Sequence, residues 1–437
     1  MRRGALLLRM GAYACSVALP AAVALATIPT IEKRLDASEF GALSFMWMFL
    51  GFLANADVGI GRALGRRVAQ DGYENSHKAI RAGFAAQALL GCLVGLAVCG
   101  AAFLAPTRAS LQIPLWIMLG AAVTLPLAII FSGVRFVMDA SNRQVLAASL
   151  SAIINTISYI VPLIAILSNR SLGEALLVLI IMRTIVFIVS IMMTMPLRLL
   201  FVGGFTELFV EIKKLLSFGF WVMTSSIVAA ANGFGDKLYA PTRIPLASLA
   251  AYSVPFDLLS KLTVGPAIVV RVLSPTYDAA NRVKVSNSVH QLGLLLSVAF
   301  CLMCLVLSLF INAVFLRWMP SANGSHMGEY AQVLLLGIAS TSFAYMAAMY
   351  LLTSGHPHLP AIVQGFLLVP YSIGIFISVQ RFSVSGLVYA WSARMIAETI
   401  ILGIATTLYT PYKRTSWILI AGGIVCSIWA GVKIFHG

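Results

Sequence analysis

Residues 173–195, GEALLVLIIMRTIVFIVSIMMTM, decide the fold class of this chain. An α-helix needs about 20 apolar residues to cross the hydrocarbon core of a bilayer. This stretch is long enough, and it carries one charge near its middle, Arg183. Similar apolar runs recur along nearly the whole sequence. We therefore predict an all-α integral membrane protein with almost nothing outside the bilayer.

The composition supports the same class. Of the 437 residues, 60% are hydrophobic and 10% are charged, whereas a soluble domain carries about 25% charged residues. A net charge of +15 would suggest nucleic acid in a soluble protein. In a membrane protein, basic residues accumulate in cytoplasmic loops as topology signals. We therefore expect no nucleic-acid partner.

The apolar runs predict about 13 transmembrane helices, with 12 or 14 left open. The candidate spans are residues 11–31, 40–60, 82–105, 113–133, 145–168, 173–195, 217–235, 246–270, 291–316, 330–353, 360–379, 385–408 and 415–434. Because a long series of spans follows, the first run is expected to be an uncleaved span and not a signal peptide.

Lys and Arg residues are distributed unequally between the two sets of loops. Loops on the side of the N-terminus carry roughly twice as many of them, which predicts a cytoplasmic N-terminus. The side of the C-terminus depends on the number of spans. No outer loop exceeds about 20 residues by this assignment, so there is no external catalytic domain and we expect no enzyme.

The spans fall into two groups of nearly equal length. We predict an N-terminal six-helix lobe at 1–195, a cytoplasmic connection at 196–216, a C-terminal six-helix lobe at 217–408 and an extra transmembrane segment at 409–437. Two six-helix lobes enter the membrane in the same orientation, as parallel repeats of transporters do.

Five charged residues lie well inside predicted spans, away from the span ends: Arg183, Asp257, Lys261, Arg394 and Glu398. A charge at the bilayer centre costs about 2.5–3.5 kcal/mol, so it usually faces a partner or a wet cavity. The last four form two pairs at spacing i, i+4, which is the spacing of a local ion pair on one helix face. They are either such pairs or the polar wall of a cavity. Arg183 has no acidic neighbour in its own span and needs a partner on another helix or an anion.

A basic cluster follows the second span. The sequence NADVGIGR at 55–62 is followed by Arg66 and Arg67. These arginines are compatible with binding to anionic lipid headgroups and equally with positive-inside signalling.

Motifs for metals and cofactors are weak or missing. The six cysteines all lie in apolar runs, which is typical of packing residues. His356 and His358 share a short loop, and no glycine-rich phosphate loop with its lysine is present. We expect no metal, no cofactor and no catalytic residue.

The order of several short motifs resembles that of the Wzx-type polysaccharide flippases. These belong to the superfamily of multidrug, oligosaccharidyl-lipid and polysaccharide exporters. The first motif is EFG at 39–41, followed by DVG at 57–59 and Arg62. Asp236, Ala251-Tyr252 and Pro275 match the family's seventh and eighth spans. The sequence GLVYA at 386–390 matches the opening of its twelfth span.

The resemblance implies two six-helix lobes around a central cavity in the bacterial inner membrane. The substrate would be an oligosaccharide repeat unit on an undecaprenyl-pyrophosphate carrier, flipped by alternating access for O-antigen or exopolysaccharide synthesis. Membrane lipids, a polysaccharide polymerase and a chain-length regulator are the other expected partners. The source of energy stays open, and a H⁺ or Na⁺ gradient is compatible with the acidic residues of the sequence.

Cationic side chains in a wet cavity would offset the desolvation of a pyrophosphate. The candidate substrate-binding residues are Arg183, Lys261, Arg271, Arg62 and Arg394. The candidate ion-coupling residues are Asp57, Asp257, Glu398 and Asp236.

Two other functions remain open. A multidrug or metabolite exporter of the same fold should carry acidic residues well inside its first-lobe spans, and Asp57, near the end of one, comes nearest to such a position. A membrane polysaccharide polymerase or ligase would need a large external loop, which the sequence does not predict.

Overall fold

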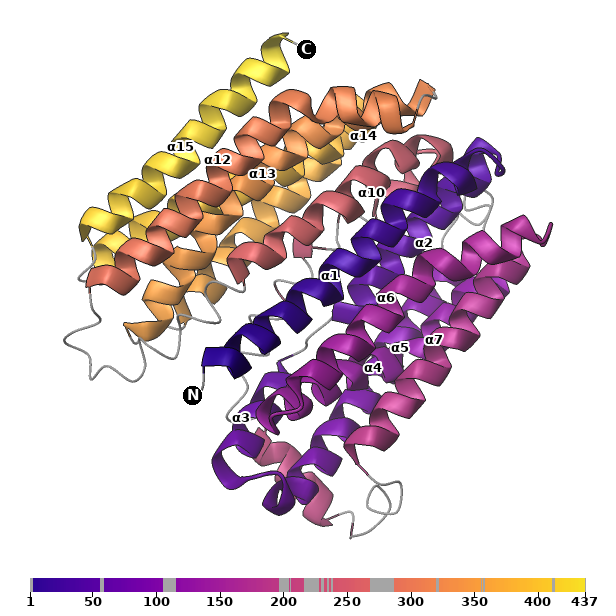
Figure 1. The fold of residues 1–437 in the computed structure, drawn as a ribbon, viewed down its shortest axis with the longest axis vertical. Coiled ribbons are helices and arrows are strands. Elements are labelled where there is room, and N and C mark those ends of the chain that lie inside the picture. Colours follow the sequence, from indigo (N-terminus) through magenta and orange to yellow (C-terminus); the bar gives the residue numbers. More distant parts are fainter. Residues whose placement is uncertain are drawn as a thin grey trace. The chain divides into compact units, whose positions relative to one another are not determined.

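The computed structural model describes most of the chain. The described residues are 3–55, 59–104, 115–195, 204, 206–215, 228, 232–233, 236, 239–267, 287–319, 322–354, 356, 358–410 and 413–436. They are nearly all helical, and no strand occurs among them. They form two compact units, Met1–Ala230 (unit 1) and Ala231–Gly437 (unit 2), coloured indigo to magenta and pink to yellow in Figure 1.

Unit 1 is built around one central helix. Its elements are α1 (Arg3–Glu32), α2 (Ala37–Asn55), α3 (Ile60–Asp71), η1 (Glu74–Ser76), α4 (His77–Leu104), α5 (Leu115–Ala140), α6 (Gln144–Leu167) and α7 (Leu172–Thr194). The central helix α5 packs against α2, α3, α4, α6 and α7, while α1 packs mainly on α6.

Unit 2 also has a central helix. Its elements are η3 (Ala240–Thr242), α10 (Leu246–Ser260), η4 (Lys261–Thr263), α12 (Asn287–Trp318), α13 (Ala322–Thr353), α14 (His358–Tyr409) and α15 (Lys413–His436). The central helix α13 packs against α10, α12, α14 and α15. The long element α14 holds two helical arms that meet at Ser383, whose φ of 54° is not helical.

The helices match the predicted spans. Seven helices of the described part are long and apolar enough to cross a membrane, and α14 is counted among them as one. Its two arms correspond to the predicted spans 360–379 and 385–408. Most of the predicted span 217–235 lies outside the described residues, and every other predicted span falls on a helix. The predicted all-α, multi-pass membrane fold is confirmed.

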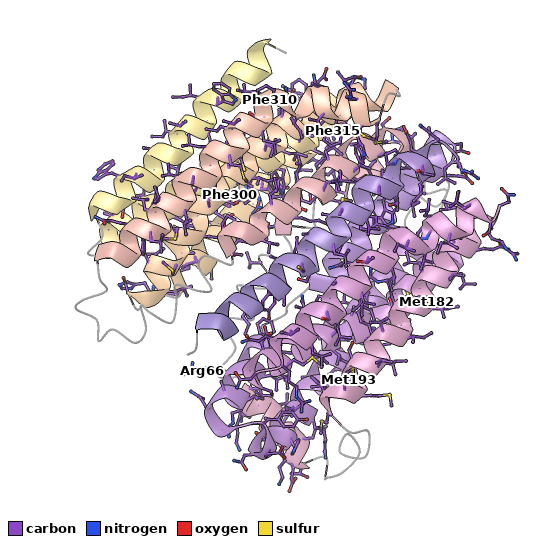
Figure 2. The ribbon with its side chains drawn as sticks, viewed as in Figure 1. Arg66, Met182, Met193, Phe300, Phe310 and Phe315 are labelled. Carbon is purple, nitrogen blue, oxygen red and sulfur yellow. The ribbon has the colours of Figure 1, made fainter. Side chains whose placement is uncertain are left out.

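The helix surfaces show which side faces lipid. On α7, Met182 and Met193 are 45% and 44% exposed, whereas Arg183 between them is 2% exposed. Phe310 on α12 is 61% exposed (Figure 2). Soluble proteins rarely leave such extended apolar surface in water. These faces are therefore suited to lipid, and the charged residue points into its own unit.

The start of α7 shows how local sequence sets a helix boundary. The Ser171 hydroxyl accepts a hydrogen bond from the Glu174 backbone N–H at 3.3 Å, and the Glu174 carboxylate accepts one from the Ser171 N–H at 3.2 Å. This capping box satisfies two backbone donors at the helix end. It fixes where the helix that carries Arg183 begins.

Candidate functional site

Arg183 joins three helices of unit 1. Its guanidinium donates to the Ser158 hydroxyl on α6 at 2.7 Å and to the Leu50 carbonyl on α2 at 2.9 Å. It also lies 5.8 Å from the centre of the Phe187 ring. The partners that the guanidinium finds on other helices are neutral dipoles.

The surroundings of Ser158 reinforce this junction. Its carbonyl accepts a hydrogen bond from the Trp47 indole at 2.7 Å, and the Trp47 and Tyr159 rings lie 5.3 Å apart. Because an arginine keeps its proton in proteins, the junction holds a buried cation solvated by dipoles. The protein covers this cation, so in the described conformation it is not open to a substrate.

The second buried cation, Arg394, has an acidic partner on its own helix. Its guanidinium lies 3.4 Å from the Glu398 carboxylate, and the two side chains are 9% and 8% exposed. Gln364, on the first arm of α14, donates to the other Glu398 oxygen at 2.9 Å. The guanidinium also lies 5.1 Å from the centre of the Tyr371 ring.

Asp236 lies in the same region of unit 2. It is fully buried, and its Oδ2 accepts a hydrogen bond from the Tyr252 hydroxyl of α10 at 2.8 Å. Asp236 and Arg394 both act electrostatically on Tyr252 and Tyr371. Among the described residues, Oδ1 of Asp236 has no hydrogen-bond partner.

These residues form one buried polar cluster within unit 2. We call it the unit 2 cluster, and it comprises Asp236, Tyr252, Gln364, Tyr371, Arg394 and Glu398. Two carboxylates stand against one guanidinium. The described side chains of this cluster therefore favour a cation over an anion.

Asp257 and Lys261 form a separate pair at the junction of α10 and η4. Their charged groups lie 2.8 Å apart, and each side chain is 19% exposed. The Lys261 ammonium also donates to the Asp257 carbonyl at 2.7 Å. The i, i+4 spacing brings the two together on one face. This pair is more open than Arg183 or the unit 2 cluster.

The other predicted site residues are distributed as follows. Arg62 lies on the exposed face of α3, while Asp57 and Arg271 fall outside the described residues. The His356 and His358 rings lie 5.9 Å apart. Within the described part of the chain, no three His, Cys, Asp or Glu side chains gather as metal ligands would.

Sequence reasoning missed Ser158, Gln364 and Tyr371. All three are uncharged polar residues inside predicted spans. That position was the signal in the sequence that could have indicated them as partners of the charged residues. The signal is weak because most hydroxyls in these helices bond to their own backbone, as Ser190 does to the Val186 carbonyl at 2.6 Å. Position in the span alone therefore does not distinguish polar side chains that bond to their own helix from those that bond to a charged residue.

Comparison with known proteins shows which fold this architecture shares. No protein-family model matches the chain. The curated "Putative O-antigen transporter" of Shigella flexneri is 21% identical over 401 residues, covering 88% of this chain and 94% of that protein. The solved structure of the lipid II flippase MurJ, in an inward closed conformation, matches with a TM-score of 0.72 at 13% identity, over 98% of this chain and 99% of that one.

A multidrug resistance MATE family transporter of the MOP superfamily, in an inward-facing conformation, matches with a TM-score of 0.56 at 13% identity. That match covers 97% of this chain and 94% of the other. The chain has the fold of MOP superfamily transporters. The resemblance that the sequence motifs indicated is thereby confirmed. At these identities the MOP fold is shared, and the substrate has to be argued separately.

Proposed function

We propose that this MOP-fold protein flips an undecaprenyl-pyrophosphate-linked oligosaccharide across the bacterial inner membrane by alternating access. The alignment with the Shigella flexneri protein, which extends over 94% of that protein, carries the proposal. The fold shared with a lipid II flippase supports it. One relative is named for O-antigen and the other for flipping a lipid, so a lipid-linked saccharide combines the two.

The pyrophosphate of the carrier needs cationic partners, because moving it out of water without them is costly. Among the described candidates, Lys261 fits this role better than Arg183 or Arg394. Its side chain is partly exposed and its ammonium already holds one carboxylate, while the two arginines are covered by protein. We assign Lys261 the main contact with the pyrophosphate, exchanged for Asp257, and keep Arg62 and Arg271 as supporting cations.

Ion coupling completes the proposal. The unit 2 cluster contains two of the candidate carriers, Asp236 and Glu398. A buried carboxylate is a suitable carrier for H⁺ or Na⁺, and both of these carboxylates are buried. Asp257 and Asp57 remain the other candidates. We also propose a cytoplasmic N-terminus, with a polysaccharide polymerase and a chain-length regulator as partners.

Deleting the gene in the bacterium that carries it tests the function. Surface polysaccharide should disappear, while lipid-linked repeat units accumulate on the cytoplasmic side and stay inaccessible to an added glycosidase. Re-expression should restore both. Normal surface polysaccharide after deletion would overturn the proposal, and a new sensitivity to toxic compounds without polysaccharide loss would favour an exporter.

Lys261→Ala tests the residue assignment. It should reduce surface polysaccharide at least tenfold while the protein remains inserted at normal amount, because about 1.4 kcal/mol of lost phosphate binding is tenfold. Arg170→Ala is the matched control, since Arg170 is also basic and paired at i, i+4 with Glu174 but is 66% exposed. Equal polysaccharide levels in the two variants would contradict the role of Lys261.

A further inference from the structure

A pocket with a basic rim lies within unit 1, outside the groups already described. It is formed by α3 and the helical residues 206–215 and has a volume of about 140 Å³. Its lining residues are Ala63, Arg66, Arg67, Gln70, Glu211, Lys214 and Leu215. A volume of this size holds several water molecules. The pocket therefore has room for a hydrated polar group.

The short helix α3 is amphipathic, and this places the pocket. Its apolar face, which includes Ile60, Leu64 and Val68, is buried, and the helix packs on α5. The opposite face carries the arginines, of which Arg66 is labelled in Figure 2. In the chain, α3 comes between the two membrane helices α2 and α4. An amphipathic helix in such a connection is suited to lie at the membrane surface.

Helical residues 206–215 form the other wall. The Glu207 carboxylate lies 3.4 Å from the Lys78 ammonium at the start of α4. The Arg81 guanidinium donates to the Gly204 carbonyl at 3.4 Å. These contacts attach the second wall to unit 1 and bring Lys214 beside arginines that are far away in the sequence.

The charge of the lining is positive. Arg66, Arg67 and Lys214 stand against one carboxylate, Glu211, which lies 2.6 Å from the Lys214 ammonium. Arg67 is additionally held by Asp71 at 2.6 Å, which is not one of the lining residues. Ala63 and Leu215 are only 5% and 8% exposed and form an apolar part of the lining.

We propose that this pocket binds the phosphate group of an anionic membrane lipid. The guanidinium fork matches the geometry of phosphate oxygens, and a lysine adds a point charge. A lining that combines basic and apolar residues suits a lipid headgroup with its glycerol or isoprenoid stem better than a free anion. Topology signalling requires basic residues on one side of the membrane, but it does not require them to surround a shared pocket.

Two lipids carry this chemistry. One is an anionic phospholipid such as phosphatidylglycerol, and the other is the undecaprenyl-pyrophosphate carrier. The site itself does not depend on the proposed transport function, because basic groups near a membrane surface attract anionic headgroups in any membrane protein. The experiment therefore includes both lipids as separate arms.

Native mass spectrometry of the purified full-length protein in detergent measures the binding. Phosphatidylglycerol and undecaprenyl pyrophosphate are titrated separately, with phosphatidylcholine as the zwitterionic reference. Lys214→Gln and Arg66→Gln should each weaken the binding of the anionic lipid about fivefold. Lys213→Gln is the matched control, because Lys213 is the adjacent exposed lysine on the same helix and does not line the pocket.

The outcomes show which of the two lipids the pocket binds. Weakening of phosphatidylglycerol binding by Lys214→Gln, with Lys213→Gln unchanged, assigns the pocket to the phospholipid headgroup. The same pattern only with undecaprenyl pyrophosphate assigns it to the carrier. Equal weakening by both substitutions indicates diffuse charge attraction and overturns the site, as does no weakening by either. Lys214→Arg, which keeps the charge, should retain binding and so exclude misfolding as the cause.

Discussion

The two units stabilise their charged side chains within the helical segments in different ways. In unit 1, Arg183 is solvated by the Ser158 hydroxyl and the Leu50 carbonyl, which come from two other helices. In unit 2, Arg394 and Lys261 each have a carboxylate four residues away on the same segment. One cation is stabilised by dipoles that the fold brings to it, and the others by charges that the helix itself supplies.

The difference matters for what a substitution leaves behind. Removing Arg183 leaves neutral groups with fewer bonds, which costs little when they keep other partners. Ser158 still donates to the Ile154 carbonyl at 3.0 Å. Removing one member of a buried ion pair leaves an uncompensated charge in a medium that solvates it poorly. Unit 2 should therefore be more sensitive to a change of charge than unit 1.

The strongest test of this contrast is Arg394→Met. It leaves Asp236 and Glu398 buried without the guanidinium, so the free energy of unfolding should fall by about 3–5 kcal/mol. Denaturant titration of the purified protein in detergent measures the loss. Adding Glu398→Gln should recover part of it, because one uncompensated charge is then removed. A double variant as unstable as the single one would refute the charge explanation.

A smaller effect is expected for Arg183→Met. Because interhelical hydrogen bonds in membranes contribute modestly, the free energy of unfolding should fall by about 1–2 kcal/mol. The same denaturant titration applies. Combining it with Ser158→Ala in a double-mutant cycle should show coupling of at least about 0.5 kcal/mol. A loss as large as that of Arg394→Met would erase the distinction between the units.

The smallest effect on stability should come from Lys261→Gln. The Asp257–Lys261 pair is partly open, and water screens such pairs, so the loss should be about 0.5 kcal/mol. Raising the salt concentration should reduce the difference from the wild type further. A loss of unfolding free energy larger than that of Arg183→Met would show that the Asp257–Lys261 pair behaves as a buried ion pair. It would then also weaken the assignment of Lys261 to substrate binding.

The sequence predicted the helices, and indicated the ion pairs as one of two alternatives, for physical reasons that act locally. Apolar runs of membrane-spanning length and the i, i+4 spacing of Asp257 with Lys261 and of Arg394 with Glu398 need no knowledge of the fold. The prediction for Arg183 was less specific, because a partner on another helix leaves no local pattern. Residues 217–235, Asp57 and Arg271 lie mainly or wholly outside the described part, so the predictions made for them stay predictions.

Other contacts depend entirely on tertiary structure. The Leu50 carbonyl that binds Arg183 belongs to an apolar residue, and nothing in its side chain marks it. The bond between Tyr252 and Asp236 joins α10 to a preceding segment. The resemblance had matched both residues without predicting their contact. Likewise, no sequence spacing connects Arg66 with Lys214.

The sequence by itself therefore determined that this chain spans a membrane many times, and it put four mid-span charges at the spacing of local ion pairs. The length of an apolar run and the periodicity of a helix involve only residues a few turns apart. The local order of residues therefore reports both. Only the tertiary structure decided which dipoles solvate Arg183, that Tyr252 bonds to Asp236, and that Lys214 completes a basic pocket. Those outcomes depend on which helices pack together, and packing is a property of the whole unit.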